Sequence, residues 1–371
     1  MTEHTYPGVY IEEIASGLHT IPGVDTSIAA FIGEAEQGPL DKAIRVKNYT
    51  EFKEKYGNPL QGSWLAHAVQ QFFNNGGALL YIARVSPPTN ASPTEQDYQQ
   101  AFNLLDKLDG ISLIAVPGMG TPSLLSFAAA YCKKRGDCFF IGEMAVDDTV
   151  SDARNFVSSL TGDCSYAAVY FPWIKLNISG SSNPIMMPPA GAVAGLYARI
   201  DAHRGVWKAP AGVEAELHGV TGLSSSVSDS EQKLLNPLGV NVIREIKQQI
   251  VVWGARTLAS QTGSEFRYVP VRRLAIYIEE SITRGTEWVV FEPNDDRLWT
   301  EIKLHVNVFL QGLFRQGAFQ GSSQRDAYFV KCDRETNTQY DIQNGILNIV
   351  VGFAPLKPAE FVVINIRHKL G

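Results

Sequence analysis

The strongest strand signal in this 371-residue chain lies at its C-terminal end. Residues 327–332, 346–353 and 361–368 are three runs rich in Val, Ile and Phe, which suit a pleated, half-buried surface. Turn signals, Asn344-Gly345 and then two prolines, separate the runs. A strand at a chain end must pair its backbone N–H and C=O groups with a neighbour, in its own sheet or in another chain.

A second strand-like segment lies at the other end of the chain. Residues 6–14 alternate in a strand-like pattern, and residues 15–20 then form a linker that contains Ser16 and Gly17. We therefore assign residues 1–20 to an arm with its linker. A single strand that a linker separates from the rest of the chain cannot bury itself. The sequence thus places adhesive strand-like segments at both ends.

Between these ends the pattern is that of an α/β protein. Residues 94–173 alternate helix and strand, which predicts a parallel sheet with helices on its faces. Residues 21–93 and 174–265 form outer and middle α/β regions around it, and residues 266–371 form a C-terminal domain. The predicted fold class is mixed α/β: a three-layer helix/sheet domain plus a C-terminal mixed-sheet domain, with extended arms at both ends.

The C-terminal domain begins with an amphipathic helix whose apolar residues recur at helical spacing from 271 to 282. We predict a strand at 288–291 and a long helix that Asp295 caps and that runs to about residue 316. The long helix carries an apolar stripe: Leu298, Ile302, Phe309 and Leu313.

Composition excludes several classes of function. A net charge of −6 argues against nucleic acid as a main partner, and no apolar run approaches the roughly 20 residues of a membrane span. The N-terminus shows no secretory signal. The four cysteines form no CxxC pair, so we expect reduced thiols, no metal and no cofactor.

Two stretches could indicate a chemical site. Gly118 to Ser123 follows a strand and opens a helix, which weakly suggests a dinucleotide loop, although Thr121 as cap and Pro122 as first helical residue explain it. Residues 201–210 combine charged side chains, Trp207 and a glycine. This combination suits either an enzyme site or a helix end at which Arg204 pairs with Asp201. We predict no catalytic residue, and a nucleotide-binding α/β enzyme remains the alternative.

Several stretches together resemble the sheath proteins of contractile phage tails and related injection systems. The resemblance covers both ends and nearly everything from residue 188 onward, whereas residues 94–173 match only in pattern. It is carried by Tyr-Pro-Gly-Val-Tyr-Ile-Glu-Glu-Ile at 6–14, Pro-Pro-Ala-Gly-Ala-Val-Ala-Gly-Leu-Tyr-Ala-Arg at 188–199, Leu-Asn-Pro-Leu-Gly-Val-Asn-Val-Ile at 235–243, Trp-Val-Val-Phe-Glu-Pro-Asn at 288–294 and Val-Gly-Phe-Ala-Pro-Leu-Lys-Pro-Ala-Glu-Phe at 351–361.

The resemblance implies a structural subunit rather than an enzyme. Such subunits form stacked hexameric rings around an inner tube and contract to drive the tube through a target envelope. The implied partners are other copies of the chain, the tube protein, and baseplate and terminator proteins, with no nucleic acid and no membrane insertion. The particle would be a phage tail or phage-like device assembled in the bacterial cytoplasm. Another tail or baseplate component is a further alternative.

The resemblance also implies roles for particular residues. Both chain ends would add strands to a sheet in neighbouring subunits, a hinge would lie at Ser16 and Gly17, and the long helix would contact the tube. A solvated helix face is the alternative for that helix. The implied exchange residues are Tyr6, Val9, Tyr10, Ile11, Ile14, Phe361, Val363, Ile364 and Ile366, and the implied tube contacts are Arg297, Lys303, His305 and Arg315.

Overall fold

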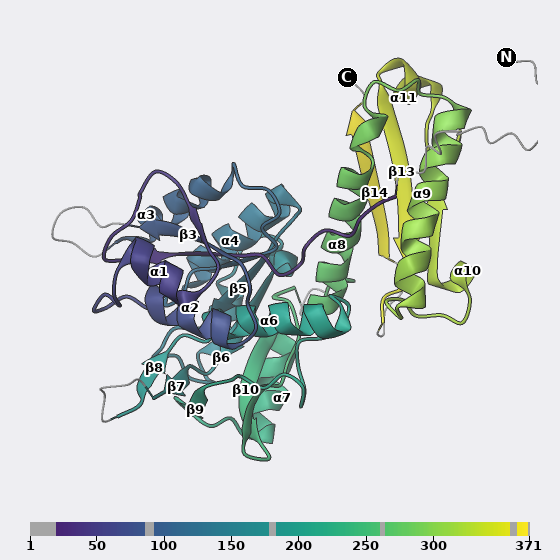
Figure 1. Cartoon of the computed structure of the whole chain (residues 1–371). Helices are drawn as coiled ribbons and strands as arrows, with labels where there is room; N and C mark the ends of the chain where they lie inside the picture. Colours follow the sequence, from purple (N-terminus) through teal and green to yellow (C-terminus); the bar gives the residue numbers. More distant parts are fainter. Residues whose placement is uncertain (1–19, 86–92, 178–182, 260–263, 357–361, 370–371) are drawn as a thin grey trace, which may run out of the picture.

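The computed structural model describes residues 20–85, 93–177, 183–259, 264–356 and 362–369, the last range as backbone only. The fold is mixed α/β, as predicted, and has two parts (Figure 1). The central part is built on an eight-stranded sheet, and the C-terminal part, residues 264–369, on a three-stranded sheet. Each part has its own cluster of buried hydrophobic side chains.

The large sheet has the order β11-β10-β6-β5-β4-β1-β3-β2. The strands from β10 to β3 pair parallel, and β11 and β2 pair antiparallel at the two edges. The predicted alternation of helix and strand is confirmed, and strands from before and after residues 94–173 join the same sheet. The strands are β1 (Ala29–Glu34), β2 (Ile44–Val46), β3 (Leu80–Val85), β4 (Leu113–Ala115), β5 (Phe139–Glu143), β6 (Ala167–Phe171), β10 (Val240–Ile246) and β11 (Gln249–Val252).

Helices cover this sheet, and a small antiparallel sheet of order β8-β7-β9 lies beside it (Figure 1). The elements are α1 (Tyr49–Tyr56), α2 (Leu65–Asn74), α3 (Glu95–Ala101), η1 (Phe102–Leu105), α4 (Pro122–Arg135), α5 (Ala153–Ser158), η2 (Cys164–Tyr166), β7 (Ile174–Leu176), β8 (Ile185–Met187), α6 (Ala190–Arg204), β9 (Val220–Leu223) and α7 (Asp229–Leu238).

Helix α6 contains two glycines because it lies unusually close to α2. A Cβ atom on Gly195 would come within 2.3 Å of the Phe72 carbonyl oxygen, and one on Gly191 within 2.5 Å of the Ala68 oxygen. No side chain fits at these distances. The two glycines weaken the intrinsic helix propensity but allow the backbones of α2 and α6 to approach.

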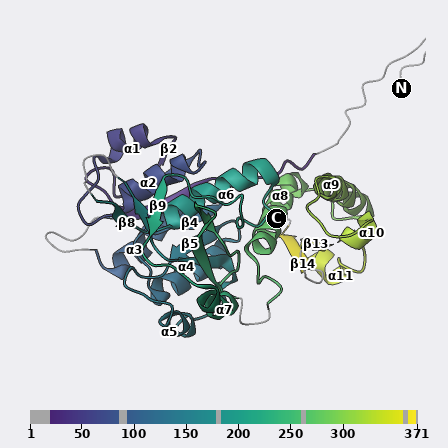
Figure 2. The ribbon, with the colours of Figure 1, turned by 90° about the horizontal axis from the view of Figure 1, so that it is seen from below.

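The C-terminal part is a two-layer unit. Helices α8 and α9 lie on one side of the sheet β12-β13-β14, whose strands pair antiparallel (Figure 2). The predicted helix at 271–282 and the Asp295 cap are confirmed: the Asp295 carboxylate accepts hydrogen bonds from the N–H groups of Arg297 and Leu298, both 3.0 Å. The elements are α8 (Val269–Gly285), η4 (Glu287–Val289), α9 (Asp296–Arg315), α10 (Gln324–Ala327), β12 (Tyr328–Lys331), α11 (Gln339–Gln343), β13 (Ile346–Phe353) and β14 (Val362–Lys369).

The strand predicted at 288–291 is wrong. This hydrophobic stretch connects α8 to α9, which run in opposite directions, so the chain must turn within a few residues. It does so as a 3-10 turn in which the Val289 N–H donates to the Thr286 carbonyl (3.0 Å). The side chain of Val289 is buried, so the apolar character of the stretch reflects packing rather than a strand.

The loop that weakly suggested a dinucleotide site is explained by packing. A Cβ atom on Gly118 would come within 2.2 Å of the Trp64 ring. The Gly118 N–H donates to the Glu143 Oε1 atom at 2.6 Å, so a side chain of this protein already occupies it. Thr121 accepts from the Leu124 N–H at 3.2 Å, which confirms the predicted helix cap.

Glu143, at the end of β5, is 1% exposed. Its second oxygen, Oε2, has no hydrogen-bond partner among the described residues. Burial raises the pKa of this carboxyl from 4.5 to about 8, and the Gly118 hydrogen bond only partly opposes that rise. The folded protein therefore keeps Glu143 protonated at neutral pH, whereas the unfolded chain releases the proton.

We expect Glu143→Gln to change how stability depends on pH. Because the folded-state pKa is raised from 4.5 to about 8, the contribution of Glu143 is complete below pH 4.5 and is lost as pH rises through this interval. A glutamine side chain does not titrate in this pH interval. The free energy of unfolding of the variant minus that of the wild type should therefore increase by roughly a few kcal/mol across the interval and then level off. Urea denaturation at a series of pH values measures it, and a difference that does not vary with pH would contradict the expectation.

Candidate interaction surfaces

The N-terminal residues implied in strand exchange, Tyr6, Val9, Tyr10, Ile11 and Ile14, lie outside the described residues, and so do the hinge residues Ser16 and Gly17. The described chain starts at Thr20, which is exposed. From there the backbone passes along α8 and enters the central part at β1 (Figure 1). The arm therefore joins the subunit beside the C-terminal part.

The C-terminal strand finds a partner within the same chain. Strand β14 pairs antiparallel with β13 along its whole length, with Val363 opposite Gly352, Ile364 opposite Val351 and Ile366 opposite Ile349. Phe361 lies outside the described residues. Among the described strands, β14 and β12 are each paired on one side only. Each therefore offers an edge to which an extended segment of another chain can add.

The four implied tube-contact residues on helix α9 differ in their exposure to solvent. Arg297 and Arg315 are exposed, and Lys303 is half-buried. His305 is only 4% exposed and packs edge-on against the Trp288 ring at 5.8 Å between centroids, so its proposed surface role is wrong. Its spacing explains the burial, because it lies three residues after Ile302 on the face that meets the sheet.

The exposed side of α9 also carries two apolar residues that the sequence analysis missed. Leu304 and Val308 are each 53% exposed. At 100° per residue they lie on the same side of the helix as Arg297 and Arg315. We call these four residues the outer face of α9. The sequence carries a signal for this face, since Leu304 and Val308 fall opposite the buried stripe at helical spacing.

The buried side of α9 agrees with the predicted stripe. Leu298, Ile302 and Leu313 are buried, and Phe309 is partly buried against the Tyr277 ring. Further buried residues that the prediction omitted are Trp299, Val306 and Leu310.

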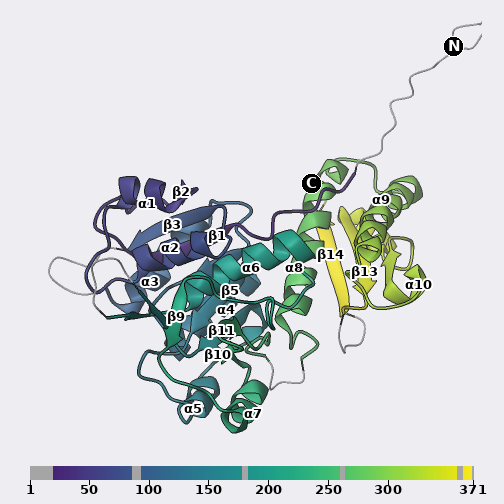
Figure 3. The same cartoon turned by 60° about the horizontal axis from the view of Figure 1, so that its bottom comes forward.

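The two parts of the molecule meet where α6 reaches α8 (Figure 3). Asp201 of α6 and Arg273 of α8 form an ion pair there, with Nη1–Oδ1 at 2.9 Å and Nη2–Oδ2 at 2.5 Å. Their side chains are 4% and 3% exposed. The expected Arg204–Asp201 pair is wrong: Arg204 points to the surface and pairs with Glu214 at 2.6 Å. Asp201 faces α8, where a buried arginine is available.

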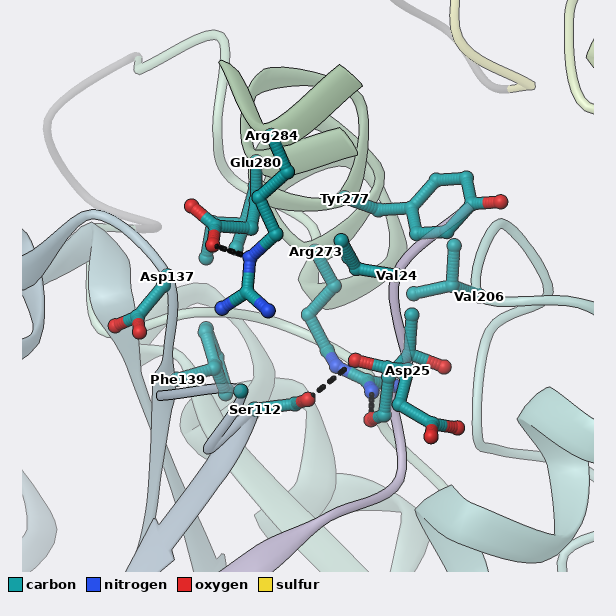
Figure 4. A pocket seen from close by; sticks show the side chains of 13 residues that line it. Val24, Asp25, Ser112, Asp137, Phe139, Val206, Arg273, Tyr277, Glu280 and Arg284 are labelled. Carbon is teal, nitrogen blue, oxygen red and sulfur yellow. Dashed lines mark hydrogen bonds and ion pairs between the residues drawn. The ribbon is translucent and has the colours of Figure 1, made fainter. Parts of the chain in front are cut away.

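A small cavity lies beside this ion pair, between α8, the start of β4 and β5, and the segment before β1. Figure 4 shows Arg273 and Tyr277 of α8 facing Val24 and Asp25 across it, with Ser112 below. Arg284 binds Glu280 on its own helix, Nε to Oε1 at 2.5 Å. Most of the charged side chains that line the cavity are thus paired, Arg284 with Glu280, Asp137 with Arg135 and Arg273 with Asp201.

A groove on the same junction is cationic. Its lining includes Arg204, Lys208 and Arg256, with the aromatic rings of Trp207 and Tyr268 between them. The Arg256 guanidinium lies 5.8 Å from the centre of the Tyr268 ring. Because Arg204 is paired with Glu214, Lys208 and Arg256 supply the positive charge of this groove.

The described residues hold no cluster of His, Cys, Asp and Glu side chains suited to a metal ion. All four cysteines are buried, and burial raises the pKa of the Cys164 thiol to about 11 and that of Cys332 to about 12. Thiols with such pKa values are poor nucleophiles at neutral pH. None of the helices in the described part of the chain combines the length and apolar composition that crossing a bilayer requires.

Comparisons with known proteins identify the family. Residues 91–258 match the phage tail sheath protein central domain, and residues 261–369 match the phage tail sheath C-terminal domain. The tail sheath protein of Burkholderia phage BcepMu is 30% identical over 159 residues, and that of Vibrio phage KVP40 is 26% identical over 181 residues. The matched regions are 41% and 48% of this chain but only 33% and 26% of those curated relatives.

Two solved structures resemble the whole chain. One is the sheath complex of PVC, an extracellular contractile injection system, in its contracted state: 31% identity, TM-score 0.78, with 98% of each chain covered. The other is the helical sheath of the anti-feeding prophage in its contracted state: 29% identity, TM-score 0.78, covering 98% of this chain and 99% of that one. The chain therefore belongs to the contractile tail sheath family and is a sheath subunit.

Proposed function

We propose that this sheath subunit polymerises as stacked hexameric rings around an inner tube and contracts to drive that tube through a target envelope. The observation that carries the proposal is the likeness to the PVC and anti-feeding prophage sheaths over at least 98% of both chains. Contraction would proceed by burying more surface between subunits, without nucleotide. The particle is a phage tail or phage-like device assembled in the bacterial cytoplasm, with baseplate and terminator proteins at its ends.

The two chain ends would hold neighbouring subunits together. The arm, with Tyr6, Val9, Tyr10, Ile11 and Ile14, would add to an open edge of the C-terminal sheet of a neighbour. Each backbone hydrogen bond contributes about 1 kcal/mol net, so one arm is modest, but a lattice repeats it at every subunit. Ser16 and Gly17 would let the subunits rotate while the arms stay bound.

The C-terminal strand would be exchanged between subunits and would keep the antiparallel pairing that it has in the single chain. In the isolated subunit β14 pairs with its own β13, and in the polymer the same ladder would form with β13 of a neighbour. Phe361, Val363, Ile364 and Ile366 would thereby pass from one subunit to the next. Exchange of an identical element is a low-cost route to assembly, because it replaces each contact with an equivalent one.

The outer face of α9 would contact the inner tube. Arg297 and Arg315 flank the exposed pair Leu304 and Val308, so charge surrounds an apolar centre. Protein interfaces commonly have an apolar centre with a polar rim. Lys303, which is half-buried, would lie at the margin of this contact.

Two alternative functions have less support. A nucleotide-binding enzyme would need a free phosphate-binding loop, but Trp64 packs against Gly118 and Glu143 binds its amide. A baseplate role is favoured by one observation, since a 29% identical chain with a TM-score of 0.77 belongs to the anti-feeding prophage baseplate. Long hollow cylinders with six-fold symmetry in electron micrographs of the purified protein would support the sheath role over both.

The first prediction concerns the arm. Deletion of residues 1–15 should abolish cylinders in negative-stain images, because neighbouring subunits lose their strand connection. The variant should still melt cooperatively near the wild-type temperature, since the described core begins after this segment. Intact cylinders from the deletion variant would refute the role of the arm.

The second prediction concerns β14. Residues 350 and 365 lie opposite each other in the β13–β14 ladder, so the double variant Val350→Cys/Asn365→Cys should form a disulfide upon mild oxidation. In free subunits the bond would be intramolecular. In assembled cylinders it would link neighbours and give a ladder of covalent multimers on non-reducing gels. Only monomeric bands from oxidised cylinders would show that β14 stays in its own chain.

The third prediction concerns α9. The double variant Arg297→Glu/Arg315→Glu should reduce co-sedimentation with the tube protein of the same particle at least roughly tenfold, since reversal at both flanks introduces like-charge repulsion. A matched control is Arg325→Glu, which reverses an exposed arginine on α10 of the same domain. Equal tube binding by the double variant and the control would exclude this face as the contact.

A further inference from the structure

Residues 20–28, which we call the connecting segment, are fixed at both ends to different parts of the molecule. At one end Ile21 is buried in the C-terminal core beside Gly285 of α8, where an added Cβ atom would come within 2.7 Å of it. At the other end the Ile28 carbonyl accepts from the N–H groups of Ser112 (2.9 Å) and Leu113 (3.1 Å) at the start of β4.

Between these ends the segment is held mainly through its backbone. The Val24 N–H donates to the Ser281 Oγ atom of α8 at 3.1 Å, and the Ser112 hydroxyl donates to the Asp25 carbonyl at 2.6 Å. Gly23 lies against the Tyr277 ring, where an added Cβ would come within 2.0 Å of the phenol oxygen. The path of the segment thus depends on what α8 and β4 present to it.

Arg273 is the side chain that ties this path to both parts. Its Nη2 atom donates to the Thr26 carbonyl at 2.9 Å while its guanidinium holds the Asp201 carboxylate of α6. The guanidinium also lies 4.8 Å from the centre of the Tyr197 ring. One buried side chain on α8 therefore contacts α6 and the connecting segment together. Removing one partner of a buried charge strongly destabilises the folded protein. The bonds of Arg273 therefore hold α8, α6 and the connecting segment in one arrangement.

We propose that Arg273 is a positioning residue that sets where the N-terminal arm leaves the subunit. By holding the Thr26 carbonyl against α8, it completes the anchoring that Ile21 and Val24 provide, so that Thr20 emerges at the end of α8. In the polymer the arm would then lead from this point to a neighbour. The binding of the arm to a neighbouring subunit rests on the proposed function. The placement of Thr20 does not, because it is a property of the single chain.

The chemistry requires arginine at this position. The planar guanidinium presents several N–H donors in a fixed fork, and here two bind the carboxylate while one also reaches a backbone oxygen. A lysine ammonium is a compact group on a flexible chain and does not reproduce this fork. Arg273→Lys therefore keeps a positive charge beside Asp201 and loses the hydrogen bond to the Thr26 carbonyl.

The test measures the distance distribution between two spin labels in the full-length monomer. One label is placed at Thr20→Cys and the other at Glu54→Cys on α1, and all four native cysteines are buried and remain unlabelled. Arg273→Lys should broaden the distribution at least twofold. It should also lower the yield of cylinders at least tenfold, because arms that leave in varied directions miss their neighbours.

A neighbouring arginine provides the matched control. Arg272 is also buried on α8, donates to the Ser165 hydroxyl of the central part at 2.9 Å and packs on the Phe266 ring at 3.3 Å. The hydrogen bond of Arg272 goes to Ser165 rather than to the connecting segment. Arg272→Lys should lower the melting temperature but leave the width of the distribution unchanged.

The outcomes separate positioning from general stability. A distribution that stays narrow in Arg273→Lys, or that broadens equally in Arg272→Lys, overturns the proposal. If Arg273→Lys does not fold, the neutral pair Arg273→Met/Asp201→Asn replaces it, since methionine has no N–H donor and the pair removes the buried charges and the bond to Thr26 together. The same broadening is expected. If the wild type forms no cylinders, the proposed function fails, while the distance measurement still decides the role of Arg273.

Discussion

Every strand must pair its backbone groups, and the central eight-stranded sheet and the C-terminal sheet of this subunit meet that requirement differently. The eight-stranded sheet ends in β2, with three residues, and β11, with four, so its edges are short. Short edge strands offer little template for another chain. The C-terminal sheet ends in β12, with four residues, on one side and in β14, with eight, on the other. The longest open edge is therefore that of β14 in the C-terminal part, and the arm joins the subunit beside this part.

The central part has a topology often associated with enzymes, but here it serves packing. Its parallel strands place Glu143 and the Gly118 loop at the same edge of the sheet, where many α/β proteins bind a ligand. In this chain the Glu143 carboxyl group accepts the hydrogen bond of the loop amide, and Trp64 fills the space over the glycine.

The sequence was most informative where the relevant interactions are local. The caps at Asp295 and Thr121, the α8 stripe and the three C-terminal strands depend on neighbouring residues and on periodicity, and all were predictable. The turn at 287–289 was not predictable, because its apolar residues serve packing between α8 and α9 and do not form a strand. The partner of Asp201 also depends on the tertiary fold, since Arg273 lies 72 positions away in sequence. For the candidate surfaces, the terminal segments were visible in the sequence. The helical spacing of α9 also places His305 on the buried side and Leu304 on the opposite side, although their residue types, polar and apolar, suggest the reverse.

The pairing of β14 with its own β13 has a consequence for how assembly can be controlled. Moving this ladder from one chain to an identical one leaves the number of backbone hydrogen bonds unchanged, so exchange has almost no intrinsic driving force. The balance between closed monomer and linked polymer then depends on how concentrated neighbouring subunits are around one another. Free subunits at low concentration would remain closed, and subunits gathered on a growing ring would open. If β14 is exchanged as proposed, its transfer would follow the gathering of subunits rather than cause it.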